Sequence, residues 1–313
     1  MSADTEATPA FAWVILAVAL FAVSSAGAVF ELIEEIAPVT KAAWRLQATA
    51  VVLLPGFLWQ YARADGEMRQ RFSGSASVLA VSGVCLAVHF GSWLMSLELT
   101  TLTHSLLFVT AHPLVIIAGL WLLRRPASQT QTAGALVGFA GAGAVILGGG
   151  AEAGVSLWGD FLAFVGAVAV VGYLAAGRAL RAWMPLFLYA FPVTLVAAVL
   201  LTMWAVVQEG ASLGFGEMSG VFGWLGAAWF AYVAYLALGP GLVGHTGINA
   251  VLRWLPPLFI SMVLIMEPVI GSLIGWMLGV DVIPGAWTLL GGAGMIAGLI
   301  LVTLEKHSEQ ETV

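Results

Sequence analysis

Two histidines and a glutamate lie inside otherwise apolar stretches of this chain. His89 opens the stretch HFGSWLMSLELTTLTHSLLFVTAHP, which ends at Pro113, and His245 is the second residue of GHTGINAVLRWLPPLFISMVLIMEP, which ends at Pro268. Imidazole titrates near neutral pH, and a carboxylate such as that of Glu267 can bind a proton or a cationic group. These side chains therefore suit proton transfer or hydrogen bonding to a small polar molecule.

The two stretches read as copies of one unit. Four positions after the first histidine stand Trp93 in the early copy and Asn249 in the late one, and immediately before the proline stand His112 and Glu267. Beyond the prolines, each copy continues with glycines seven positions apart inside a hydrophobic segment. Two similar halves in a membrane chain are typical of a secondary transporter with its site between the repeats.

The composition indicates an integral membrane protein. The chain has 313 residues, of which 61% are hydrophobic and 9% charged, whereas soluble domains carry about 25% charged residues. Its net charge of −6 argues against nucleic acid as a partner. The single cysteine, Cys85, excludes an intramolecular disulfide framework.

Ten apolar segments have roughly the 20 residues that a membrane-spanning helix needs. Their predicted starts lie near Phe11, Lys41, Ser75, Thr103, Thr130, Leu157, Met184, Val221, Pro256 and Gly285. The eighth segment is interrupted by the sequence GPG, and we expect a kinked or broken helix there, because proline removes a backbone hydrogen bond that only a cavity or a neighbouring helix can replace. The predicted fold is all-α, with ten transmembrane helices.

The basic residues predict the orientation. Lys and Arg concentrate on cytoplasmic loops, and with the N-terminus inside, only Lys41 and Arg45 fall on the outer side. Five helices per half is an odd number, so the second repeat must enter from the opposite face, which makes the repeats inverted around a central cavity. We therefore expect cytoplasmic tails at 1–10 and 305–313, a first repeat at 11–150 and a second repeat at 151–304, in the inner or plasma membrane.

The pattern HFGSWLMSLELTT…VTAHP, followed by GLVGHTGINAVLRWL…MEPVIGSLIGWML, resembles the EamA-type members of the drug/metabolite transporter superfamily over nearly the whole chain. The resemblance implies two inverted five-helix repeats, a central cavity, alternating access, and export or exchange of metabolites such as amino acids, nucleosides or toxic organic compounds. It matches Arg45 to an arginine often found in helix two, and Asp160 to an acidic position that opens helix six. The family's Gly-Glu-Arg turns are replaced here by LLRRP and LGVDV, so a loop-closing ion pair does not carry over.

Each polar candidate has a structural alternative. Glu267 could carry a proton or bind a cation, or it could be a neutral acid, or a partner of His112, that fixes two helices together. His89 and His245 could carry protons or donate hydrogen bonds to substrate, or they could be an inherited packing pair. Aromatic side chains near the first histidine suit a partly apolar or aromatic substrate, although core packing explains each one equally well; they are Trp93, Phe90 and Phe108.

Arg45 and Lys41 lie at or below the outer end of the second segment, near Glu31, Glu34 and Glu35. Pairing with this acidic loop is the favoured interpretation, and binding of a substrate carboxylate at the outer mouth is the alternative. A phosphate or nucleotide-sugar substrate is disfavoured, because several cations are expected around phosphates.

The predicted function is secondary active transport of a small metabolite or drug-like molecule, most simply export, with protons as a candidate coupling ion. The rival is a receptor or subunit that binds a small ligand without moving it. An enzyme is not expected, since the chain has no GxSxG, HExxH or HxxxH motif, and no cofactor or metal is predicted. The predicted substrate contacts are His89, Trp93, His112, His245, Asn249, Glu267, Arg45, Phe90 and Phe108.

Overall fold

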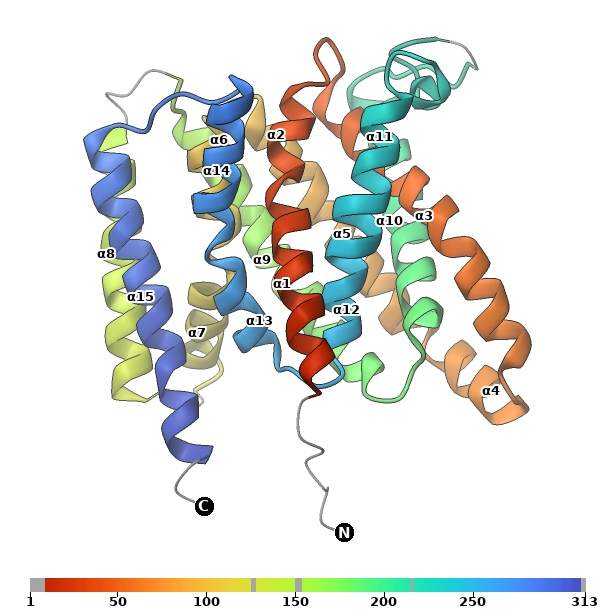
Figure 1. Ribbon diagram of the computed structural model, residues 1–313, viewed down its shortest axis with the longest axis horizontal. Coiled ribbons are helices and arrows are strands. Elements are labelled where there is room, and N and C mark those ends of the chain that lie inside the picture. Colours follow the sequence, from red (N-terminus) through yellow and green to blue (C-terminus); the bar gives the residue numbers. More distant parts are fainter. Residues whose placement is uncertain (1–8, 125–127, 150–153, 215–216, 311–313) are drawn as a thin grey trace.

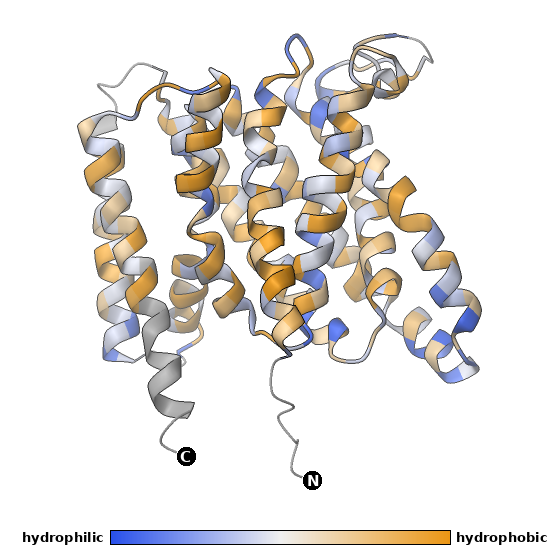
Figure 2. Ribbon diagram, in the orientation of Figure 1, coloured by the Kyte–Doolittle hydropathy of each residue, from blue (hydrophilic) through white to orange (hydrophobic). Residues whose placement is uncertain are grey.

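The computed structural model describes residues 9–124, 128–149, 154–214 and 217–310, and within these ranges the chain is helical and contains no strand. Five of the described helices, counting two broken ones as continuous, are long and apolar enough to cross a membrane: Ala10–Glu31, Ala76–Leu97, Leu102–Leu122, Leu157–Arg181 and Leu186–Gln208. Apolar residues cover the middle of the helices, and hydrophilic residues gather near their ends (Figure 2). The prediction of an all-α membrane protein is confirmed.

The helices follow the predicted segments with small shifts. They are α1 (Ala10–Ser24), α2 (Ala26–Glu31), α3 (Pro38–Arg63), α4 (Gly66–Gly74), α5 (Ala76–Leu97), α6 (Leu102–Val109), α7 (His112–Leu122), α8 (Gln129–Gly149), α9 (Leu157–Arg181), α10 (Leu186–Gln208), the 3-10 helix η1 (Gly223–Leu225), α11 (Phe230–Leu236), the π-helix η2 (Ala237–Thr246), α12 (Gly247–Val251), α13 (Pro257–Leu264), α14 (Glu267–Leu278) and α15 (Ala286–Gln310).

Two helical rods are broken just before a proline. The helix α6 ends at Val109 and α7 begins at His112, with Pro113 in its first turn; α13 ends at Leu264 and α14 begins at Glu267, with Pro268 in its first turn. Proline has no N–H and fits the start of a helix better than its interior. The two breaks thus fall where the sequence repeat places its prolines.

The predicted break in the eighth segment is a π-helix. Pro240 lies inside η2, flanked by the glycines of the GPG sequence, and His245 lies in its last turn. The start of this segment was predicted wrongly: the helix begins at Phe230, not near Val221. The preceding residues form tight turns instead. Glycine at position 223 permits them, because a Cβ there would lie 2.2 Å from the carbonyl oxygen of Met218.

Figure 1 shows α8 and α15 side by side at one end of the molecule and α3 with α4 at the other. The start of α1, the end of α15, the helix α4 and the α9–α10 link all lie at the lower edge of this view. The α8–α15 contact depends on glycine: a Cβ on Gly298 would lie 2.3 Å from the amide nitrogen of Gly138 and 2.4 Å from the carbonyl oxygen of Gly134. Small residues of this kind let helix backbones approach closely in a membrane.

We expect Gly141→Ala to weaken the α8–α15 contact, because its Cβ would lie 2.5 Å from the amide nitrogen of Met295 and 2.6 Å from the carbonyl oxygen of Gly291, and backbone cannot move aside cheaply. The free energy of unfolding should fall by roughly 1–3 kcal/mol, measured in detergent by following tryptophan fluorescence during denaturation. Gly143→Ala on the same helix is the control, because a Cβ there meets nothing within 4 Å. Equal stability of the two variants would contradict this account.

Candidate functional site

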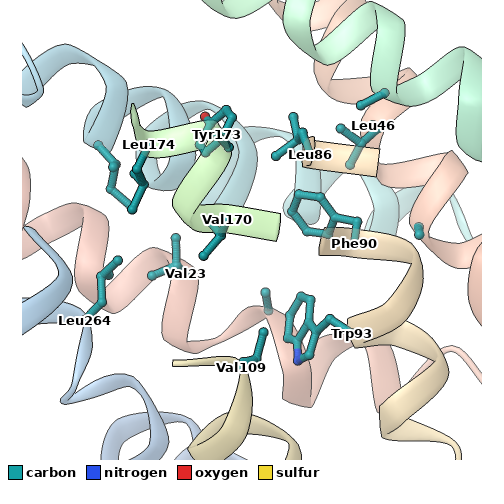
Figure 3. Close-up of a cluster of buried hydrophobic side chains, with 14 of the residues drawn as sticks. Val23, Leu46, Leu86, Phe90, Trp93, Val109, Val170, Tyr173, Leu174 and Leu264 are labelled. Carbon is teal, nitrogen blue, oxygen red and sulfur yellow. The ribbon is translucent and has the colours of Figure 1, made fainter. Parts of the chain in front are cut away.

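A cavity lies where the broken helices meet, and both halves of the chain line it. About 450 Å³ of this space is free of protein atoms. Its apolar wall includes Val23, Val109, Val170 and Leu264, which Figure 3 shows together with Trp93. Its polar lining consists of Arg45, His89, Trp93, Thr110, His112, His245 and Glu267.

The cavity is narrow in this conformation. The centres of water molecules can occupy only about 40 Å³ of it, and one water needs roughly 10–15 Å³ of such space. It therefore holds a few waters, and a metabolite can enter only if the surrounding helices move apart.

Arg45 lies in this cavity, which corrects the favoured expectation that it pairs with the acidic outer loop. Its side chain is 1% exposed, its guanidinium carbon lies 4.4 Å from the centre of the Phe90 ring, and neither terminal nitrogen has a hydrogen-bond partner among the described residues. Lys41, one turn earlier on α3, does not pair with that loop either among the described residues; its Nζ lies 2.6 Å from a carboxylate oxygen of Glu98, at the end of α5. Arg45 is thus a buried basic side chain that lines the cavity with both terminal nitrogens unpaired among the described residues.

His89 and His245, from the two similar sequence stretches, lie close together beside this space. The ring centres of His89 and His245 are 6.2 Å apart, and the ring of Phe90 lies 5.2 Å from that of His245. His89 Nδ1 is 3.0 Å from the carbonyl oxygen of Gly166. Since a carbonyl can only accept, this nitrogen carries the proton, and Nε2 of neutral His89 is left as an acceptor.

Several buried polar atoms around the cavity have no partner among the described residues. Besides Arg45, they include Nδ1 of His112, Nδ1 of His245, the indole nitrogen of Trp93 and Oδ1 of Asn249. Buried polar groups are normally hydrogen-bonded, and an exception calls for an explanation such as water or a ligand. Apart from the Asn249 atom, they belong to residues that line this one cavity, which is what makes it the candidate site.

Asn249 and Phe90 line an adjoining space of about 280 Å³, which shares Arg45 and His245 with the main cavity. The amide nitrogen of Asn249 donates to the hydroxyl of Tyr173 over 2.6 Å. Nothing in the spacing of the sequence linked Tyr173 to this asparagine, because the two residues come from different helices that meet only in the fold.

The structure does not place Phe108 with the other predicted contacts. It lines neither of these two spaces, and its ring centre lies 6.5 Å from that of His104. The expected aromatic wall therefore consists of Trp93 and Phe90 without Phe108. The reason is the direction in which neighbouring side chains leave a helix. Phe108 is the residue before Val109, the last residue of α6, and it is Val109 that lines the cavity.

A second buried polar cluster was not predicted from the sequence. His104 has its Nδ1 3.1 Å from a carboxylate oxygen of Asp160 and its Nε2 2.9 Å from the hydroxyl of Thr288. The hydroxyl of Thr100 also donates to Asp160 over 2.9 Å. These bonds tie α6, α9 and α15 together, and because His104 and Asp160 are partnered we assign this cluster to stability.

Thr103, in the first turn of α6, donates to a carboxylate oxygen of Asp281 over 2.7 Å. Burial raises the pKa of the Asp281 carboxyl, and the hydrogen bonds from Thr103 and from the amide of Val282 oppose that shift. This link joins α6 to the segment between α14 and α15.

A larger cleft of about 1160 Å³ lies between α6, α14 and α15. Its lining is mostly apolar and contains no charged side chain, and several of its residues are exposed, including Trp276 and Ile283 at 56% and 74%. It lacks the convergent polar groups that distinguish a small-molecule site. Size alone therefore does not make it the candidate site.

Comparisons with known proteins show the fold. No family model matches the chain, and no curated protein sequence matches it. The chain is similar to a protein of known crystal structure, with a TM-score of 0.64 and 20% sequence identity over 96% of this chain and 99% of the other. A likeness at this level of identity shows a shared fold and carries no activity across.

The same substitution at two histidines should separate the stabilising cluster from the candidate site. His104→Phe removes the histidine partner of the buried Asp160 carboxyl group and leaves it the hydroxyl of Thr100, so the free energy of unfolding should fall by about 3–5 kcal/mol. His245→Phe puts a somewhat larger apolar ring beside the cavity and removes an unpaired ring nitrogen, so stability should be unchanged or raised by up to roughly 1–3 kcal/mol. Denaturation in detergent measures both, and a larger loss for His245→Phe would contradict the assignment.

Proposed function

We propose that this protein is a secondary transporter that moves a small organic molecule across the membrane by alternating access, most simply as an exporter. The observation that supports it best is the cavity between the two halves of the chain, where unpaired polar atoms of Arg45, His112, His245 and Trp93 converge with the carboxylate of Glu267. Discontinuous helices around a central polar site are characteristic of secondary transporters.

The proposed architecture has ten crossings in two inverted repeats. It counts each broken rod as one crossing: α1 with α2, α6 with α7, α11 with η2 and α12, and α13 with α14. Two observations support the repeat. The breaks before Pro113 and Pro268 are alike, and the residues on either side of each break, Val109 with His112 and Leu264 with Glu267, all line the cavity.

The resemblance to EamA-type members of the drug/metabolite transporter superfamily supports the same proposal. It accounts for the helix order, for the paired prolines and for an arginine in α3. In this arrangement the lower face of Figure 1 is cytoplasmic, because α4 with its arginines and the basic end of α9 lie there.

The narrow cavity fits a transporter caught between its open states. A ligand-sized space requires the halves to rock apart, and each rocking direction would open the site to a different side. A receptor would need only to bind, so binding without flux would favour the non-transporting alternative.

Purified protein in proteoliposomes should move at least one member of a panel of labelled amino acids, organic acids, amines and nucleosides. Arg45→Gln and Glu267→Gln should each reduce that flux by at least about tenfold, because each removes a charge that faces the cavity. His245→Phe should also lose flux while remaining folded. Matched controls are Arg69→Gln and Glu67→Gln on the exposed helix α4, which should transport like the unchanged protein. Unchanged flux in both Arg45→Gln and Glu267→Gln would contradict the proposed site.

The proposed orientation is tested by labelling single cysteines with an impermeant maleimide, after Cys85→Ala has removed the native thiol. Glu34→Cys, in the exposed link between α2 and α3, should react on intact cells. Gln70→Cys, on exposed α4, should react only after the cells are permeabilised. The opposite pattern would place the N-terminus outside.

A further inference from the structure

The central cavity holds one cation and one carboxylate that do not touch. Arg45 is fully buried, with both terminal nitrogens unpaired, and Glu267 is the one carboxylate among the described residues that line the space. No ion pair joins them among the described residues, so the terminal nitrogens of the guanidinium keep their donors free. The carboxylate of Glu267, in the same lining, balances the charge of Arg45. Arginine of this kind is ready to form paired hydrogen bonds with a carboxylate.

We propose, on the basis of the transport function proposed above, that the cavity takes a small organic carboxylate on Arg45 and that each anion enters together with one proton, which Glu267 takes from solvent. The anion and the proton then cross in the same direction as a neutral pair.

The count of charges supports the proton. In this proposal Arg45 is a cation and Glu267 an anion before the ligand binds, so the charges of the cavity balance. A carboxylate that binds without a proton would leave one net negative charge in a low-dielectric space, which is strongly unfavourable. A proton on Glu267 restores neutrality and leaves two charges, those of Arg45 and its ligand, in direct contact.

The other titratable groups around Glu267 fit the role less well. His89 and His112 come from α5 and α7, His245 from η2, and Tyr173 stands beside His245 from α9, with ring centres 6.4 Å apart. Protonating a histidine would also balance the charge, but it would leave four buried charges, whereas protonating Glu267 leaves two. The helices α1, α2 and α6, which pack against α14, contribute only apolar residues to the lining.

The walls define the rest of the ligand. Phe90 lies under the guanidinium in the adjoining space, and Trp93 lines the main cavity together with the four apolar side chains named above, so an apolar ligand body suits this part of the wall. With one cation in the lining, a phosphate or a dicarboxylate would lack a second partner. The class that fits is a small monocarboxylate with an apolar or aromatic body.

Isothermal titration calorimetry tests this with two probes of similar size and opposite charge, 3-phenylpropionate and phenethylamine. Titrations in phosphate and in Tris at pH 7 report proton uptake, because the two buffers differ in ionisation enthalpy. We expect 3-phenylpropionate to bind at least about tenfold more tightly than phenethylamine, with close to one proton taken up per anion. Glu67→Gln should behave like the unchanged protein.

Two variants assign the roles. Glu267→Gln should still bind the anion, since the amide resembles a protonated acid, but uptake of the proton should vanish. Arg45→Gln should weaken the binding of 3-phenylpropionate by at least about tenfold. It should also protonate Glu267 without ligand, seen as an acid carbonyl band in infrared spectra that the double variant Arg45→Gln/Glu267→Gln lacks.

Any of four results would overturn the inference. Two concern affinity: tighter binding of phenethylamine, or no binding of 3-phenylpropionate at millimolar concentration. Two concern the proton: anion binding without proton uptake, or proton uptake that persists in Glu267→Gln. Flux of an amine or a nucleoside in proteoliposomes under those outcomes would leave the transport function standing and remove only the carboxylate and its proton. Proton-linked binding of the anion without any flux would leave the carboxylate site standing and remove the transport function together with the joint crossing.

Discussion

An arginine with free donors in the middle of a membrane protein is the constraint on which the rest of this structure depends. A charged side chain at that depth costs roughly 2.5 kcal/mol or more even on lenient scales, and unpaired donors add to the cost. Arg45 is kept in place by packing, with the ring of Phe90 on one side and that of Phe30 5.7 Å from its carbon. A fold that keeps such a group without a close partner has placed it where something else can bind.

The irregular backbone has the same explanation. Helices in lipid satisfy their own hydrogen bonds, and breaks are tolerated only where protein or a cavity replaces them. The break after Val109, the break after Leu264 and the π-helix that carries His245 all face the same space. The prolines and glycines that cause these breaks are therefore placed where an interrupted helix adds polar groups to a site, and regular helices such as α8, α9 and α10 surround them.

Much of this arrangement was predictable because membrane sequences are strongly constrained. Hydropathy and length placed most helix starts within a few residues, and the repeated histidine and proline spacing marked the prolines at which two helices are broken, although only the break in the eighth segment was predicted. What failed was what depends on tertiary contact. Val221 looked like a helix start because its surroundings are apolar, but the glycines there allow tight turns. Arg45 was assigned to an acidic loop because the sequence shows only that loop nearby, whereas the fold turns its side chain inward and gives Lys41 the ion pair. His104 and Asp160 are 56 positions apart, and no local pattern predicts that they bond.

The two buried polar clusters show how one membrane protein separates stability from function. Around His104 and Asp160 the hydrogen-bonding groups meet protein partners, which fixes α6, α9 and α15 in one arrangement. Around Arg45, His112 and His245 several such groups have no partner in the part of the chain that the structure describes, so the free energy of that region depends on what enters. Glycine packing between α8 and α15 adds a rigid edge, because contacts between backbones leave little room to slide. Movement that admits a ligand is therefore expected at the broken helices beside the cavity, where partners are missing and the backbone ladder is already interrupted, and not at the saturated cluster or the glycine-packed pair.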